Sequence, residues 1–133
     1  GIIVPFDSEI NTLKDLKGKK IGIPFGASSH YLALDMIKEA GPDPDKDIEQ
    51  INLNVAEQNA LINAGWDEID ALVSWDPLIS IFESKEQAKV IQTGPVMLLI
   101  VMNQNLEVKK QEAMMKAIAE SIYEKVIKPY NKI

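Results

Sequence analysis

The sequence contains no cysteine and only one histidine among its 133 residues. Without cysteine, the chain can form no disulfide bond, thiolate nucleophile or thiolate metal site. One histidine completes neither a histidine-rich zinc site nor a histidine relay. Any catalysis would therefore depend on carboxylates, lysines, hydroxyls or a cofactor.

Long apolar runs and basic clusters are also missing. The longest apolar run, VMLLIVM at 96–102, has the length of a strand and falls short of the roughly 20 residues that a membrane span needs. The net charge of −6 comes without a basic patch, which argues against nucleic acid as a partner. No basic segment followed by an apolar one opens the chain, so no export signal is visible. Gly1 in place of Met suggests a processed or cut chain.

Segments typical of strands and of helices alternate along the chain. Strands are expected at 1–6, 20–24, 48–54, 69–75, 88–93 and 96–104, and helices at about 29–40, 55–64, 77–84 and from Leu106 onward. This alternation predicts an α/β lobe with a mostly parallel central sheet flanked by helices on both faces. The expected core positions in the helices are Ala33, Met36, Ile37, Ala40, Val55, Leu61, Ile62, Met114, Met115, Ile118, Ile122 and Val126.

The stretch PFGASSHY, at 24–31, joins a predicted buried strand to an amphipathic helix. Ligands of open α/β sheets bind beyond the carboxyl ends of the strands, where helix N-termini favour an anion. Gly26 permits close approach of the backbone, and Ser28 and Ser29 add hydroxyl donors. This turn is therefore a candidate cradle for a carboxylate, sulfonate or phosphate oxygen. The alternative is that one serine serves only as the helix N-cap.

Two further positions qualify the candidate site. His30 is expected to be neutral and to act as a donor or a packing group, because a helix N-terminus disfavours a cation. Trp75 ends the predicted strand 69–75, where a tryptophan can wall a ligand pocket, and Pro77 suits the first helical position after Asp76 as cap. The alternative for Trp75 is a core side chain beside a capped helix.

Three segments, taken together, resemble a known family. They are DLKGKKIGIPFGASSHYLALDMIKEAG at 15–41, INLNVAEQNALINAG at 51–65 and IDALVSWDP at 69–77. Their order and spacing resemble the solute-binding proteins of ABC importers for sulfonates, nitrate and thiamine precursors, most of all the taurine and aliphatic-sulfonate branch.

The resemblance implies one lobe, spanning 1–133, of a two-lobed receptor with a type II periplasmic-binding-protein-like fold, without its N-terminal partner lobe. It implies capture of a small anionic solute, taurine or another alkanesulfonate, for import through an ABC permease in the membrane. No catalysis, cofactor or metal is expected. The implied location is extracytoplasmic, periplasmic or as a membrane-anchored lipoprotein, and the isolated lobe is a candidate homodimer. The implied ligand-binding residues are Phe25, Gly26, Ala27, Ser28, Ser29, His30, Trp75 and Asp76.

Some features depart from the family pattern and leave other functions open. WDE at 66–68 lengthens the junction before Ile69, and the carboxylate of Asp76 would repel an anion or accept a ligand amine. One alternative is a thiamine-pyrimidine precursor-binding or -synthesising protein of the same fold family. Such synthesising enzymes look cysteine-containing and cofactor-dependent, unlike this chain. The other alternative is a ligand-sensing domain of a signalling protein.

Overall fold

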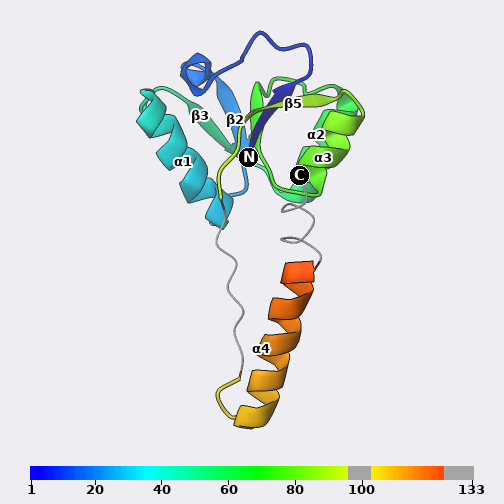
Figure 1. Ribbon diagram of the computed structural model, residues 1–133. Helices are drawn as coiled ribbons and strands as arrows, with labels where there is room; N and C mark the ends of the chain where they lie inside the picture. The colour runs from blue at the N-terminus through cyan, green and yellow to red at the C-terminus, as the bar shows by residue number, and fades with distance from the viewer. Residues whose placement is uncertain (96–102, 125–133) are drawn as a thin grey trace. The chain divides into compact units, whose positions relative to one another are not determined.

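The computed structural model describes residues 1–95 and 103–124 of the chain. The chain divides into two compact units, Gly1–Val96 and Met97–Ile133 (Figure 1). The elements of the first unit are β1 Ile2–Pro5, the 3₁₀ helix η1 Leu13–Leu16, β2 Lys20–Ile23, α1 Ser28–Ala40, β3 Glu49–Asn52, α2 Val55–Ala64, β4 Ala71–Val73, α3 Leu78–Ser84 and β5 Ala88–Gln92. The second unit contains α4, Val108–Ile122. That 1–133 form one lobe stays a prediction.

The first unit is built on a sheet with the strand order β3-β2-β4-β1-β5. Strand β2 pairs in parallel with β3 and β4, whereas β1 pairs antiparallel with both β4 and β5. Strands β2, β3, β4 and β5 therefore point the same way, and β1 opposes them. The predicted α/β class is confirmed; the sheet, expected to be mostly parallel, is mixed because β1 runs against the other strands.

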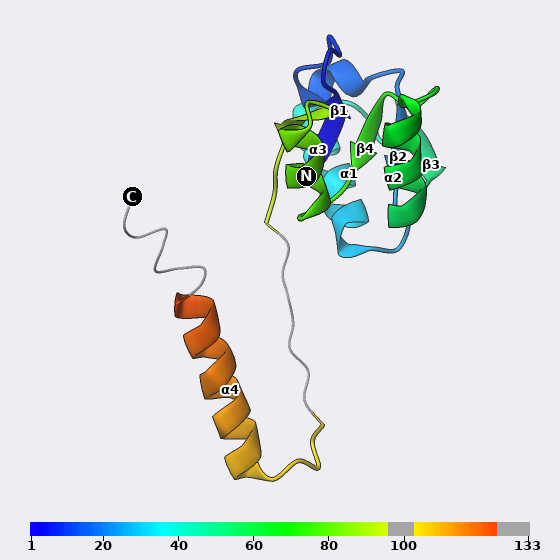
Figure 2. The same ribbon diagram turned by 90° about the vertical axis from the view of Figure 1, so that its right-hand side faces the viewer.

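Helices cover both faces of this sheet, with α1 on one face and α2 and α3 on the other (Figures 1 and 2). Side chains alternate between the faces along each strand. In β4, Val73 packs into the cluster that contains Ile37 of α1, and Leu72 packs into the cluster that contains Ile62 of α2 and Phe82 of α3. The two clusters explain why both faces of the strands read as apolar.

Two glycines have structural roles: Gly22 allows close packing around β2, and Gly65 ends α2. A Cβ on Gly22 would overlap the side chain of Leu72 and lie 2.6 Å from Leu53 Cδ1, so only glycine fits this position of β2. Gly65 adopts φ 102°, a left-handed conformation, and its N–H donates to the carbonyls of Ile62 and Leu61 at the end of α2. In both places the backbone arrangement is possible because glycine has no side chain.

The core predictions hold for most positions in the first unit and are wrong in part of the second. Ala33, Ile37 and Ile62 are buried. Met36, Ala40 and Leu61 are partly buried against the core, and Val55 is half-buried outside both clusters. Met114 and Met115 are 47% and 59% exposed, and no residue of α4 is buried in its described part. The reason is that periodicity marks the apolar face of a helix without fixing what covers it. Val126 and most of the predicted strand 96–104 lie outside the described residues.

Within residues 1–95 and 103–124, none of the helices combines the length and the apolar character that crossing a bilayer requires.

Candidate functional site

The two predicted site segments follow neighbouring strands of the sheet. Strand β2 leads into α1 through Pro24–Ala27, and β4 leads into α3 through Ser74–Pro77. Because β2 and β4 are parallel neighbours, both segments leave the sheet at its carboxyl edge. In α/β folds this edge is where small ligands bind.

The backbone of the turn between β2 and α1 is held by its own hydrogen bonds. The N–H of Phe25 donates to Asn52 Oδ1 at 3.1 Å, and the N–H of Gly26 donates to His30 Nδ1 at 3.2 Å. The N–H of Ala27 donates to the carbonyl of Pro24 at 3.2 Å. Gly26 has φ 80°, which other residues rarely adopt. The N–H groups of residues 25–27 are thus engaged within the protein.

The free donors of the turn belong to the two serines. Helix α1 begins at Ser28, and its N-cap, Ala27, makes no side-chain cap bond, so neither serine is the N-cap. Within the described residues, the N–H groups of Ser28 and Ser29 donate to no acceptor, as is usual for the first positions of a helix. Ser29 is only 6% exposed, and its Oγ has no partner among the described residues. A buried hydroxyl without a partner is uncommon and needs an explanation.

Aromatic rings stack beside this turn. The rings of Phe25 and His30 lie 4.8 Å apart at 6°, and those of His30 and Tyr31 lie 5.2 Å apart at 29°. Since His30 Nδ1 accepts from Gly26, the remaining proton sits on Nε2, which lies 3.4 Å from Gln50 Oε1. The neutral imidazole expected from the sequence is the form that satisfies both contacts.

The second segment forms one wall of a hollow of about 390 Å³. Trp75 and Asp76 line it together with Ile79 and Thr93. Trp75 is 37% exposed, so the alternative of a core tryptophan is wrong. The prediction of Asp76 as the helix cap is wrong, because α3 begins at Leu78 and its N-cap is Pro77, which makes no side-chain cap bond. Asp76 Oδ1 instead accepts from the N–H of Ser80 at 3.3 Å and from its Oγ at 2.6 Å.

Two polar residues at this edge escaped the sequence analysis. Gln58 and Ser74 are fully buried, and neither Gln58 Oε1 nor Ser74 Oγ has a partner among the described residues. Gln58 Nε2 donates to the carbonyls of Leu53 and Val73 at 3.2 and 3.0 Å, which ties α2 to the ends of β3 and β4. The available signal was that Gln58 lies four residues before buried Ile62, on the apolar face of α2.

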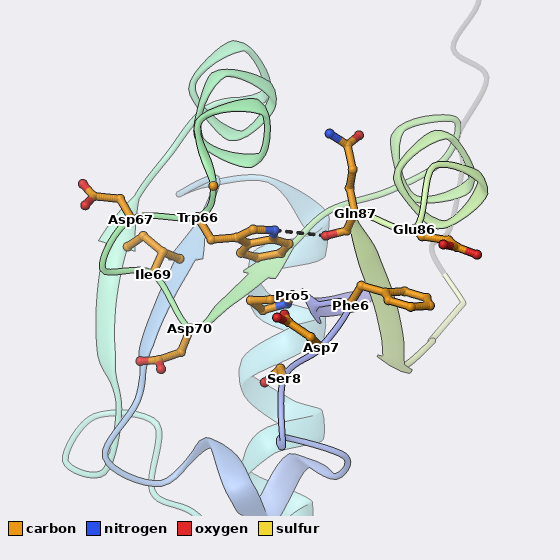
Figure 3. A pocket seen from close by; sticks show the side chains of 11 residues that line it. Pro5, Phe6, Asp7, Ser8, Trp66, Asp67, Ile69, Asp70, Glu86 and Gln87 are labelled. Atoms are coloured by element: carbon orange, nitrogen blue, oxygen red, sulfur yellow. Dashed lines mark hydrogen bonds between the residues drawn. The ribbon is translucent and has the colours of Figure 1, made fainter.

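A larger hollow of about 660 Å³ lies at the opposite, amino edge of these strands (Figure 3). The carboxylates that line it belong to Asp7, Asp67, Asp70 and Glu86, and no lysine or arginine is among the described residues that do so. Trp66 Nε1 donates to the carbonyl of Gln87 at 3.1 Å across one wall. Its size is suitable for a ligand, but its charge repels an anion.

Free N–H donors and a buried hydroxyl at the N-terminus of α1 are features that favour an anion in proteins of α/β fold. Residues 1–124 match the family described as "ABC transporter, phosphonate, periplasmic substrate-binding protein". The chain belongs to this family. The resemblance seen in the sequence, to solute-binding proteins of ABC importers, is thereby confirmed.

Proteins named for sulfonate binding are among those that this chain resembles. A "putative aliphatic sulfonates-binding protein" of Escherichia coli (strain K12) is 34% identical over 93 residues, 70% of this chain and 28% of that protein. The alkanesulfonate-binding protein SsuA of Xanthomonas axonopodis pv. citri, solved with MOPS bound, is 34% identical, with a TM-score of 0.63 over 68% of this chain and 30% of that one. The periplasmic aliphatic sulphonate-binding protein SsuA of Escherichia coli is also 34% identical, with a TM-score of 0.62 over 68% of this chain and 30% of that one. This chain spans less than a third of each.

Proposed function

We propose that this chain supplies part of the ligand site of an extracytoplasmic ABC-importer receptor, and that it holds the anionic head of an alkanesulfonate. The observation that carries the proposal is the buried, unpartnered Oγ of Ser29 at a helix start with two free N–H groups. A sulfonate presents three acceptor oxygens to these three donors. The positive end of the α1 dipole adds to the attraction.

The other end of the solute would lie toward Trp75 and Asp76. Trp75 offers a partly exposed indole to an alkyl chain, and the carboxylate of Asp76, whose charge also acts on the Gly1 amine, would attract an ammonium group. A sulfonate with an amine, such as taurine, would use both features. A simple alkanesulfonate would use the indole alone, so comparing the two solutes measures the contribution of Asp76.

The mechanism we propose is capture and closure without a chemical reaction. The solute would bridge this lobe and the partner lobe of the whole receptor, and shift an open–closed equilibrium that the membrane permease reads. This chain alone would keep only part of the contacts, so its affinity is expected in the millimolar range. Dimer formation by the isolated chain belongs to the same proposal and is testable by sedimentation.

The direct test is an amide NMR titration of the isotope-labelled chain with butanesulfonate, taurine, methylphosphonate and sulfate. We expect saturable shifts at 26–31, and with taurine also around Asp76. In Ser29→Ala the affinity should fall about tenfold, the loss of one hydrogen bond to a charged group. The folded state should not suffer, because the change removes a buried hydroxyl that has no partner.

The matched control is Ser84→Ala, which removes an exposed hydroxyl that donates to the carbonyl of Ile81 on α3. Its affinity should equal that of the unmodified chain. If the amides at 26–31 do not respond to any anion, either in this chain or in the whole receptor, the proposal is wrong. Tighter binding of methylphosphonate than of butanesulfonate would instead assign the phosphonate class that the family description names.

A further inference from the structure

The single histidine of the chain sits in the turn, yet none of its polar atoms is free to serve as a ligand donor. Its N–H donates to the carbonyl of Ala27 at 3.0 Å, Nδ1 accepts from Gly26, and Nε2 faces Gln50. The ring is stacked between Phe25 and Tyr31. His30 is therefore built into the support of the turn.

The bond to Gly26 matters because of where the glycine lies. Gly26 precedes the N-cap by one residue and has a left-handed φ, and its N–H is the one in the turn that donates to a side chain of α1. With Nδ1 as acceptor, the Gly26 N–H is tied to α1 by an exposed hydrogen bond between residues four apart in the chain. The next two peptide units lead directly to the N–H groups of Ser28 and Ser29.

We propose that His30 is a positioning residue whose neutral imidazole, by accepting from Gly26, holds the anion-binding turn in its binding conformation, so that protonation of the ring weakens anion capture. The inference rests on the proposed function of the turn. A protonated imidazole carries hydrogen on both nitrogens, so Nδ1 would then face the Gly26 N–H donor to donor. Histidine is the side chain that changes charge between about pH 5 and 8.

The charged groups near His30 are few. The charged residues on the elements packed against it are Glu49, next to Gln50 on β3, and Asp45, next to Pro44, whose carbonyl accepts from Gln50 Nε2 at 2.9 Å. The charge of Glu49 acts on Lys20, and that of Asp45 acts on Lys46. Tyr31 is the other titratable ring in contact with it. Within the described residues, His30 forms no ion pair.

Two variants separate the role of His30 as a hydrogen-bond acceptor from the role of its ring in aromatic stacking. His30→Asn places an amide oxygen where Nδ1 stood, loses the aromatic stack and cannot titrate. His30→Phe keeps the stack and loses the acceptor. The experiment measures butanesulfonate affinity at pH 8 and pH 5 in the full chain, because a sulfonate stays ionised across this range. It also follows the Gly26 amide shift over the same range without ligand.

The unmodified chain should lose affinity by about fivefold between pH 8 and pH 5, the effect of one hydrogen bond. His30→Asn should bind equally at both pH values, and His30→Phe should bind weakly at both. Gln50→Glu, which sets a carboxylate beside Nε2, should move the midpoint of the Gly26 shift up by about one pH unit. A purely structural role for the ring would give none of this pH dependence.

Two results would overturn the inference. Tighter binding at pH 5 would make His30 an ionic partner of the solute, and a Gly26 amide that ignores pH would mean that the hydrogen bond is not decisive. The ligand-free shift separates these failures from failure of the proposed function. If no anion binds while the Gly26 amide titrates with the ring, the proposed function is wrong and the His30–Gly26 bond stands.

Discussion

The carboxyl and amino edges of strands β2 and β4 present opposite combinations of size and chemistry. The carboxyl edge offers a turn with free N–H groups, a buried serine hydroxyl and a hollow of about 390 Å³. The amino edge offers a hollow of about 660 Å³ lined by four carboxylates. Volume alone would select the amino edge, and donor chemistry selects the carboxyl edge.

The difference originates in the direction of the chain. Where a parallel strand ends and a helix begins, N–H groups remain unpaired and the peptide dipoles point their positive ends outward. At the amino edge the chain arrives from helix C-termini and turns, where carbonyls prevail. The three described non-glycine residues with left-handed φ, namely Trp66, Asp67 and Glu86, all line the hollow there. Tight turns and carboxylates therefore accompany the amino edge.

The largest effect should come from placing a negative charge at the carboxyl edge. Ser29→Asp would set a tethered carboxylate among the donors, and like charges brought together cost several kcal/mol. We expect butanesulfonate affinity to fall by about a hundredfold or more, measured by amide NMR. The helix should persist, because an acidic residue in the first turn favours helix formation.

The matched change at the amino edge is Asp67→Asn. Asparagine tolerates the left-handed φ of 45° at this position and removes one negative charge. Anion affinity should stay within about twofold, because salt screens charges beyond about 8 Å. If Asp67→Asn tightened binding as much as Ser29→Asp weakened it, the anion would lie at the amino edge and the comparison would reverse.

A change in the strand that joins the two edges should disturb both. In Gly22→Ala the added methyl would overlap Leu72 and press on Leu53, and overpacking of this kind costs about 1–3 kcal/mol. Urea unfolding should show the loss, and amides at 26–29 and 66–70 should shift together. Gly18→Ala is a comparison in which no atom lies within 4 Å of the added methyl. Its φ of 79° adds strain of its own, so only Gly22→Ala should move both edges.

Most of the fold was predictable because the signals were local. The apolar spacing of Ala33 and Ile37 and the stop at Gly41 place α1 within one residue of its observed span. The antiparallel β1 was not predictable, since strand direction is decided by pairing between Ile3 and Leu72, far apart in sequence.

The candidate site also contains some features that the sequence predicts and others that it does not. Gly26, Ser28 and Ser29 were identifiable from composition and from position after a strand. The bond from the Gly26 N–H to His30 Nδ1 depends on the conformation of the turn, and the burial of Ser74 depends on tertiary packing, neither of which a sequence period encodes. The exposure of Met114 was not predictable for a similar reason, because the apolar pattern of a helix face is the same whether or not another element covers that face.

A smaller effect is expected from the hydrogen bond that spans the amino-edge hollow. Trp66→Phe removes the Nε1–H that donates to the Gln87 carbonyl at 3.1 Å and leaves that acceptor unpaired. The free energy of unfolding should fall by about 1 kcal/mol in urea. Anion affinity should not change. Loss of affinity in Trp66→Phe, without loss at Phe6→Leu on the exposed side of the same hollow, would show that the two edges are coupled.

The smallest effect, and the sharpest separation of the edges, concerns pH. The hydrogen bond from Lys20 Nζ, at 2.9 Å, lowers the pKa of Glu68 at the amino edge. A lowered carboxylate pKa contributes stability above the ordinary value of about 4.3, and that contribution is lost as pH falls through the lowered pKa. The urea midpoint of Glu68→Gln should therefore fall slightly less between pH 6 and pH 3 than that of the unmodified chain. The difference should be slight, because the Glu68 side chain is 79% exposed and solvent screens the pair.

The Gly26 amide should instead respond between about pH 8 and 5, where histidine titrates. If the Glu68 amide moved with Gly26 in that upper window, the two edges would share one equilibrium, and the division of the sheet into an anion-binding edge and an acidic edge would fail.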